Sequence, residues 1–129
     1  MKQISVQTRS RFEMMDITAA VQKAAREEGI ESGMVLVYTP HTTAAVTINE
    51  NADPDVPRDM LAALDRMVPL SANYRHAEGN SAAHVKSTLV GASETIIIED
   101  GRLVLGTWQS VFFCEFDGPR TRQIIMKFL

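Results

Sequence analysis

Three histidines are the side chains of this sequence best suited to do chemistry at neutral pH. His41 follows an apolar run and a proline, while His76 and His84 flank a polar loop. Neutral imidazole binds metal ions and transfers protons, and three histidines plus one water form a known catalytic zinc arrangement. The long spacing matches no short zinc motif, and a lone histidine is more often a surface or core residue. The sequence therefore indicates three candidate metal ligands, but it does not show that the three side chains lie close together in the fold.

The segment that contains His76 and His84 predicts a loop followed by a helix. Within one helix these two residues would lie about 12 Å apart, too far to share one metal ion. We expect the helix to begin at residue 80 or 81, so that a turn at Gly79 brings His76 back towards His84. Free backbone N–H groups at a helix start favour an anion. The candidate ligand-binding residues of this segment are Asn80, Ser81 and Lys86.

Polar residues also stand at both ends of the strand expected at 44–49. Thr42 and Thr43 precede it, and Asn49 and Glu50 end it. The two ends are separated by the strand, so the two polar groups need not touch. The ordinary alternative is that the threonines are strand residues and that 49–53 forms a turn and a helix cap. The candidate roles are ligand binding for Thr42, Thr43 and Asn49, and acid or base chemistry for Glu50.

Trp108 and Cys114 are each the only residue of their type. A lone tryptophan is most often a core or interface anchor, and the lining of a ligand pocket is the alternative role for Trp108. One cysteine excludes an intramolecular disulfide and a thiolate zinc cage. Because Cys114 stands in an apolar run, we expect it to be a buried and inert strand residue.

The elements that must position these residues follow from hydrophobic periodicity and from helix-ending residues. We expect seven strands, at 2–8, 34–39, 44–49, 94–98, 102–105, 110–117 and 120–128, with a turn at 99–101. We expect three helices, the first over 17–28 after Asp16, the second opened by Asp53 or Asp55 and ended by Pro69, and the third ended by Gly91. These elements do not alternate as strand and helix. The fold class is therefore α+β, with the helices on one side of a largely antiparallel sheet.

Length and charge narrow the function classes. The 129 residues suit a single domain spanning 1–129, which needs no disulfide or metal to fold. Thirteen basic and sixteen acidic residues give a net charge of −3, without the basic footprint of a nucleic-acid binder. No apolar stretch is long enough for a signal peptide or a membrane helix. We therefore expect a cytoplasmic protein that binds neither nucleic acid nor membrane.

Three segments in this order resemble a known family. They are HTTAAVTINENADPDVPRDM at 41–60, YRHAEGNSAAHVKSTLVGASET at 74–95 and GRLVLGTWQSVFFCEFDGPRTR at 101–122. Together they are similar to the YjbQ-like family, whose members are described as secondary thiamine-phosphate synthases. The resemblance implies an α+β homotrimer with a polar site near a subunit boundary. The residues it implicates are His41, His76 and His84, and in the NEN-D stretch Asn49, Glu50 and Asp53.

The resemblance also implies a weak activity, which joins a pyrimidine diphosphate to a thiazole phosphate and releases pyrophosphate. In this hypothesis the histidines hold a divalent ion, zinc or magnesium, His41 and His84 act in catalysis, and Glu50 or Glu78 is the acid or base. Some members carry a longer loop with an Asp-Asp pair before the third histidine. Here the loop is short, and the possible oxygen ligands are Glu50, Asp53 and Glu78. The alternative is a trimeric metal- or ligand-binding protein without robust catalysis.

Overall fold

The computed structural model describes all 129 residues. It contains eight strands and three helices. In chain order these are β1 (Lys2–Gln7), β2 (Glu13–Asp16), α1 (Thr18–Glu27), β3 (Ser32–Tyr38), β4 (Ala44–Glu50), α2 (Asp55–Met67), α3 (Ser81–Val90), β5 (Ser93–Glu99), β6 (Arg102–Leu103), β7 (Gln109–Glu115) and β8 (Thr121–Phe128).

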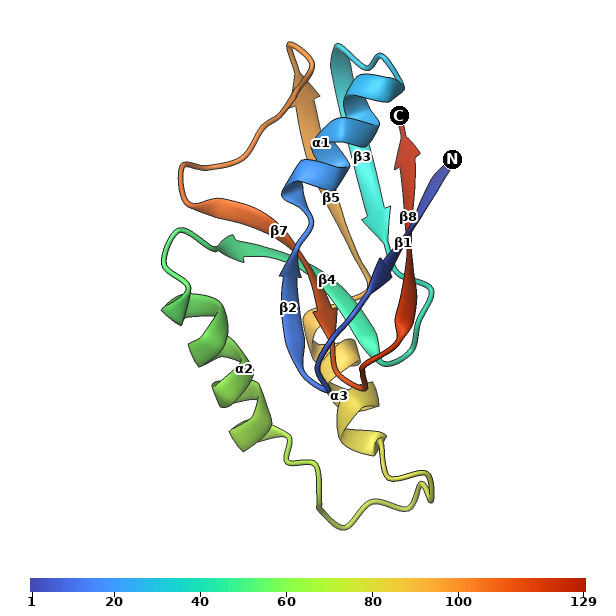
Figure 1. Cartoon of the computed structure of the whole chain (residues 1–129), viewed down its shortest axis with the longest axis vertical. Coiled ribbons are helices and arrows are strands. Elements are labelled where there is room, and N and C mark those ends of the chain that lie inside the picture. The colour runs from blue at the N-terminus through green and yellow to red at the C-terminus, as the bar shows by residue number, and fades with distance from the viewer.

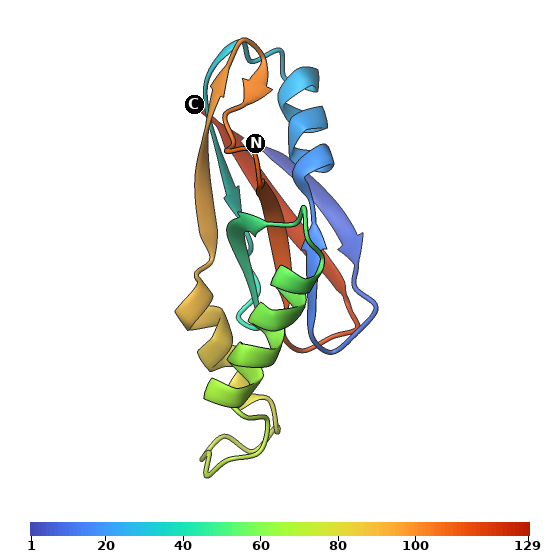
Figure 2. The same ribbon diagram turned by 90° about the vertical axis from the view of Figure 1, so that its left-hand side faces the viewer.

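The strands form two antiparallel sheets. The larger sheet has the order β1-β8-β3-β5-β6, and the smaller one has the order β2-β7-β4. Figures 1 and 2 both place α1 near the end of the molecule that holds the two termini, and α2 and α3 near the other end. No helix is both long enough and apolar enough to cross a membrane.

The main core lies between the two sheets and α1. In β3, Val35 and Val37 are buried while Met34 and Tyr38 face outward, as the two-residue period of a strand requires. The same inward alternation in β5 and β8 completes this side of the core. Fully burying one such aliphatic side chain stabilises the fold by roughly 1.5–3 kcal/mol. The core members from the smaller sheet and α1 are Ala44, Val46, Val111, Phe113, Val21, Ala24 and Ala25.

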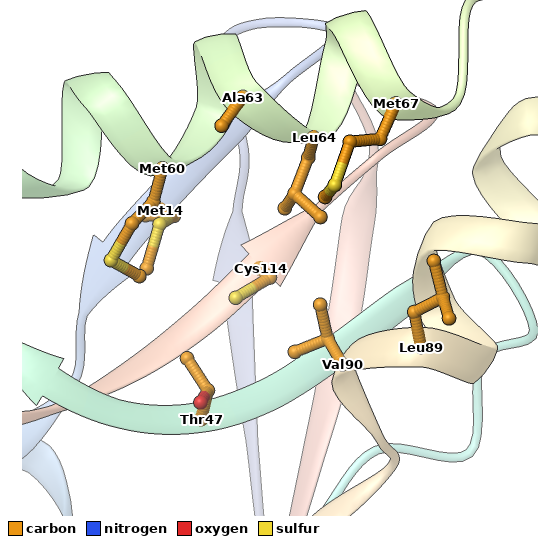
Figure 3. Close-up of a pocket in the computed structure, with 9 residues that line it drawn as sticks. All are labelled: Met14, Thr47, Met60, Ala63, Leu64, Met67, Leu89, Val90 and Cys114. Carbon is orange, nitrogen blue, oxygen red and sulfur yellow. The ribbon is translucent and has the colours of Figure 1, made fainter.

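A second apolar cluster lies on the other face of the smaller sheet, under α2 and α3. Phe112, Cys114 and Phe116 are buried there, and Leu61 and Leu64 of α2 pack against them. An apolar pocket of about 380 Å³ lies between α2, α3 and the smaller sheet. Figure 3 shows Met60, Leu64 and Met67 of α2 on one side of it and Cys114 on the other. Burial raises the pKa of the Cys114 thiol to about 12, so this cysteine is the buried, inert strand residue expected.

The expected α+β class is confirmed, and two details differ from the sequence prediction. The sequence prediction missed β2, whose four residues are too few to show a clear alternation. The sequence prediction also placed all three helices on one side of a single sheet. In the structure the strands form two sheets, α1 packs on the main core, and α2 and α3 cover the second apolar cluster. Periodicity reports which face of a strand is buried, but not which strand lies beside it.

Candidate functional site

Three loops that are distant in the sequence meet at one polar pocket of about 370 Å³. They are the β3–β4 loop, the loop that leads into α3, and the β7–β8 turn. No hydrophobic side chain lines the pocket, which we call the histidine pocket. Its lining residues are Pro40, His41, Thr42, Thr43, Glu78, Asn80, His84, Asp117, Arg120 and Arg122.

His41 is anchored to the backbone of β8. The backbone N–H of Gln123 donates a hydrogen bond of 2.9 Å to His41 Nε2, and the N–H of His41 is 3.4 Å from Thr39 Oγ1. Burial lowers the pKa of His41 below its ordinary value, and the nearby Arg122 guanidinium lowers it further, against an opposing effect of Glu115. The ring is therefore neutral at neutral pH.

His84 and His76 lie side by side, as the turn at Gly79 predicts. Their ring centroids are 5.7 Å apart with an edge-to-face angle of 85°. Gly79 has a φ of +81°, a conformation that glycine adopts without steric cost, and this turn returns the chain towards α3. A carboxylate oxygen of Glu78 lies 3.7 Å from His76 Nε2. Of these two histidines, only His84 lines the histidine pocket; His76 and His84 also share a smaller neighbouring pocket.

A buried ion pair with Glu115 holds Arg122, which lines the pocket. The carboxylate of Glu115 in β7 accepts hydrogen bonds from Arg122 in β8 and from Thr8 Oγ1, the latter at 2.7 Å. Burial alone would raise the pKa of Glu115, but these hydrogen bonds outweigh it and hold the pKa below its ordinary value. The second guanidinium nitrogen of Arg122 also reaches Thr43 Oγ1 at 2.8 Å. This network fixes Thr43 and Arg122 at the pocket wall.

Asp117 joins the α3 side of the pocket to the β7–β8 turn. Its carboxylate accepts hydrogen bonds of 2.9 Å from Asn80 Nδ2 and from Arg120 Nη2. Asn80 precedes α3 as expected, but its side chain makes no capping hydrogen bond, because its amide is turned towards Asp117. The other amide atom, Asn80 Oδ1, is the only buried side-chain polar atom without a partner. Ser81 is the first residue of α3 and lies in the smaller pocket with His76 and His84.

Several residues singled out in the sequence lie away from this pocket. Asn49 and Glu50 occupy the far end of β4, where they pair with Ser110 and Gln109. Trp108 directly precedes β7, at the same end of the smaller sheet, and is 63% exposed, so it anchors no core within the chain. Asp53 lies in the connection that follows β4 and caps the N–H of Asp55. The structure thus divides the predicted site residues between the two ends of one strand.

Lys86 points away from the histidine pocket. Its side chain is almost fully buried, with the ammonium 3.2 Å from Asp65 of α2 and 4.0 Å from the centre of the Phe12 ring. The position five residues into α3 turns it to the face that packs against α2. The structure therefore places Lys86 in the contact between two helices, not beside the free N–H groups at the start of α3.

Sequence reasoning missed Asp117, Arg120 and Arg122, although one signal was present. Arg122 has the same parity in β8 as the buried residues Ile124 and Met126, and Glu115 ends a buried apolar run. A positive and a negative charge at two buried positions indicate an ion pair, because an unpaired charge is rarely buried. These two positions therefore pointed to a contact between β7 and β8.

Comparisons with known proteins identify the family of the chain. A family model described as "UPF0047 protein YjbQ-like" matches residues 2–129. The chain belongs to the YjbQ-like family. The UPF0047 protein YugU of Bacillus subtilis is 55% identical over 100% of this chain and 98% of its own length, and the UPF0047 protein MJ1081 of Methanocaldococcus jannaschii is 50% identical over 96% and 90%.

Solved structures of YjbQ-like proteins share the whole fold. A conserved protein of the family from Clostridium acetobutylicum is 51% identical, with a TM-score of 0.98 and full coverage of both chains. The conserved protein TT1486 from Thermus thermophilus is 40% identical, with a TM-score of 0.94 and full coverage of both chains. The family resemblance seen in the sequence is thus confirmed over the full length of the domain.

Within the single chain, the three histidines do not form the metal site that the YjbQ-like resemblance implies. No group of three or more His, Cys, Asp or Glu side chains is arranged to hold a metal ion. His76 and His84 are adjacent, but His41 directs Nε2 at the backbone of Gln123. The metal role of these three histidines, with zinc or magnesium, stays a prediction.

Proposed function

We propose that the histidine pocket binds the phosphate or diphosphate group of a small metabolite. The observation that carries the proposal is the pocket lining, which combines two histidines, two arginines and two threonine hydroxyls without any hydrophobic side chain. Arg120 is half exposed, and Asp117 fixes the position of its guanidinium at the pocket. Hydrogen bonds from charged donors to phosphate oxygens are roughly twice as strong as neutral ones.

The start of α3 adds to the anion preference of the pocket. Glu78, Asn80 and His84 line the pocket around the first turn of this ten-residue helix. The first N–H groups of a helix have no intrahelical partner and carry partial positive charge. Glu115 and Asp117 offset the charges of Arg122 and Arg120, and Glu78 adds a negative charge, so donor geometry rather than net charge would hold the ligand.

A weak thiamine-phosphate-synthase-type transfer is the finer form of this proposal. In such a reaction pyrophosphate leaves, and donors around the departing oxygens stabilise the negative charge that develops there. His41, His84 and Arg120 would supply these donors, and Glu78 would be the acid or base, because the other carboxylate of the pocket, Asp117, is bonded to Arg120 and Asn80. Glu50, the other candidate, lies at the far end of β4. The activity that the YjbQ-like resemblance implies and the polar pocket support this form of the proposal.

Calorimetric titration with inorganic pyrophosphate tests the binding proposal. We expect Arg120→Ala to weaken pyrophosphate binding at least about tenfold, which corresponds to ~1.4 kcal/mol. Arg58→Ala is the matched control, because Arg58 is an exposed arginine on α2 away from the pocket. Equal affinities for the wild type and Arg120→Ala would overturn the proposal, and so would the absence of pyrophosphate binding to the wild type.

Turnover with the pyrimidine diphosphate and the thiazole phosphate tests the finer form. We expect His84→Ala to lower the rate of thiamine phosphate formation, because His84 lies between three of the pockets around the site. An unchanged rate would reject a catalytic role for His84. The expected fold must be verified by circular dichroism in both proteins before the rates are compared.

A homotrimeric ligand-binding protein without robust catalysis is the second candidate. It is favoured by an apolar strip on the outer face of the larger sheet, where exposed Met34 of β3 pairs with exposed Ile97 of β5, near exposed Tyr38. Uncovered apolar strips on sheets often mark association surfaces. Light scattering after size exclusion gives the mass, and we expect Ile97→Lys to dissociate the trimer. A monomeric wild type would contradict the trimer, and pyrophosphate binding without turnover would favour this candidate.

A further inference from the structure

We infer that His41 is held as the Nδ1–H tautomer and donates a hydrogen bond to an anionic oxygen of the ligand in the histidine pocket. This inference rests on the proposed function and assigns one atom of the pocket a specific role. It also identifies which histidine is not free to bind a metal ion.

The contact with Gln123 sets the tautomer. A backbone N–H is a donor only, so the atom that receives it, His41 Nε2, must carry a lone pair and no proton. A neutral imidazole has one N–H, which is then on Nδ1. The protonated ring and the Nε2–H tautomer would each point a hydrogen at the N–H of Gln123.

Both partners in this contact are held in place. Gln123 lies in β8, between β1 and β3 of the larger sheet, and its neighbour Arg122 is bound by buried Glu115. On the other side of His41, the backbone N–H of buried Thr39 donates a hydrogen bond of 2.9 Å to Ala92 O. The hydroxyl oxygen of Thr39 accepts a hydrogen bond from the backbone N–H of His41. The position of Nε2 against β8 is therefore fixed by the sheet, and the orientation of the ring follows from it.

The Nδ1–H group is free, and the ring that carries it lines the pocket. No side chain or backbone group of the chain hydrogen-bonds to His41 Nδ1, and the atom is not among the buried polar atoms that lack a partner. It is therefore open to solvent, and the ring lines both the histidine pocket and an adjoining pocket of about 520 Å³. None of the hydrogen bonds of Asp117, whose Oδ2 accepts from Asn80 and Arg120, involves His41. An oxygen of a phosphate ligand in the pocket is the acceptor that we assign to this donor.

The same geometry separates His41 from a metal-binding role. A metal ion needs a nitrogen lone pair, and the lone pair of His41 is directed at the backbone of β8. Ligation through Nε2 would leave the N–H of Gln123 without its partner inside a central strand. The ligand that fits His41 is therefore an oxyanion.

Long-range ¹H–¹⁵N correlation spectra of the full-length ¹⁵N-labelled protein test the tautomer directly. His76→Ala and His84→Ala assign the other two rings by removing their signals. At about pH 7.5, where neutral imidazole prevails, we expect the Nδ1–H pattern for His41 in the free protein. We expect added pyrophosphate to shift Nδ1 and leave Nε2 unprotonated, and added zinc ions to leave both nitrogens unchanged. An Nε2–H pattern, or zinc bound at Nε2, would overturn the inference.

Two variants test the donor by affinity. The amide nitrogen of Asn occupies roughly the place of Nδ1, and that of Gln roughly the place of Nε2. We expect His41→Asn to retain pyrophosphate affinity within about threefold and His41→Gln to lose about tenfold. Equal losses in both variants, or no pyrophosphate effect on Nδ1 in a protein that binds pyrophosphate, would overturn the donor role. If the spectra show the Nδ1–H pattern but the protein binds no pyrophosphate, the tautomer is confirmed and the proposed function is wrong. The phosphate oxygen is then not the acceptor of the hydrogen bond from His41.

Discussion

Arg122 and Glu115 form an ion pair that joins the two sheets at the wall of the histidine pocket. Arg122 belongs to β8 of the larger sheet and Glu115 to β7 of the smaller one. Their side chains are 4% and 0% exposed, so the contact is shielded from bulk solvent. The pair therefore positions the pocket by holding β7 against β8, the strand that carries Gln123, and Arg122 also fixes Thr43 of the β3–β4 loop.

Removing the charge of Glu115 is expected to destabilise the fold strongly. Glu115→Gln leaves the guanidinium of Arg122 buried without its counter-charge, and breaking a buried pair in this way costs about 3–5 kcal/mol. Lys23→Gln is the control, since the Lys23–Glu27 pair is exposed and such pairs contribute about 1 kcal/mol or less. Urea unfolding measures both. Equal effects of the two substitutions would show that the buried pair does not hold the sheets together.

Acidification is expected to lower the free energy of unfolding. Glu115 and Asp16 have folded-state pKa values below their ordinary values of 4.5 and 3.8. For Asp16, burial raises the pKa, and hydrogen bonds from Thr18 and Asn51 outweigh it.

Each of these two groups contributes stability that is present above its ordinary pKa and is lost as the pH falls through the folded-state pKa. His41 also lowers the free energy of unfolding on acidification, beginning at a higher pH than the two carboxylates. Its folded-state pKa lies below 6.5, so below that pH the unfolded chain takes up a proton that the folded chain does not. Urea midpoints across the acid range measure the change, and a midpoint that rises on acidification would contradict it.

Gly118 is expected to tolerate no side chain. A Cβ at this position would lie 2.4 Å from the backbone oxygen of Ser10 and 2.7 Å from Glu115 Cγ. Gly118→Ala therefore forces the β1–β2 connection away from the β7–β8 turn, with a loss of at least about 1–3 kcal/mol. Gly106→Ala serves as comparison, because its Cβ would meet only the flexible side chain of Gln109, at 3.3 Å. Thermal melting curves that coincide for both variants would refute the close approach.

Lys86 is expected to stabilise the helix packing without taking part in ligand binding. Lys86→Ala removes a buried stem and the contacts with Asp65 and Phe12, with an expected loss of about 2–4 kcal/mol. Exposed Lys127→Ala should change stability by less than about 0.5 kcal/mol. Pyrophosphate affinity should be the same in both variants and in the wild type. A loss of pyrophosphate affinity in Lys86→Ala but not in Lys127→Ala would show that Lys86 binds phosphate, as the sequence predicted.

The local elements were predictable because their signals are local. Gly91 ends α3 as expected, and the 99–101 turn holds Asp100 and Gly101 at φ values of +53° and +72°, which turn residues of these types adopt readily. The pairing of strands was not predictable, because β1 and β8 meet across almost the whole chain length. Nothing in the alternation of either strand identifies its partner.

The candidate site divides in the same way. The sequence by itself determined the family, the α+β class and the positions of the three histidines at junctions between elements, because periodicity and turn residues act over a few neighbours. Only the tertiary structure decided that His41 faces β8, that His76 and His84 touch, and that Glu50 and Trp108 lie at the far end of β4. The physical reason is that the two sheets close around a shared core, and the buried pair of Glu115 and Arg122 fixes which loops then meet.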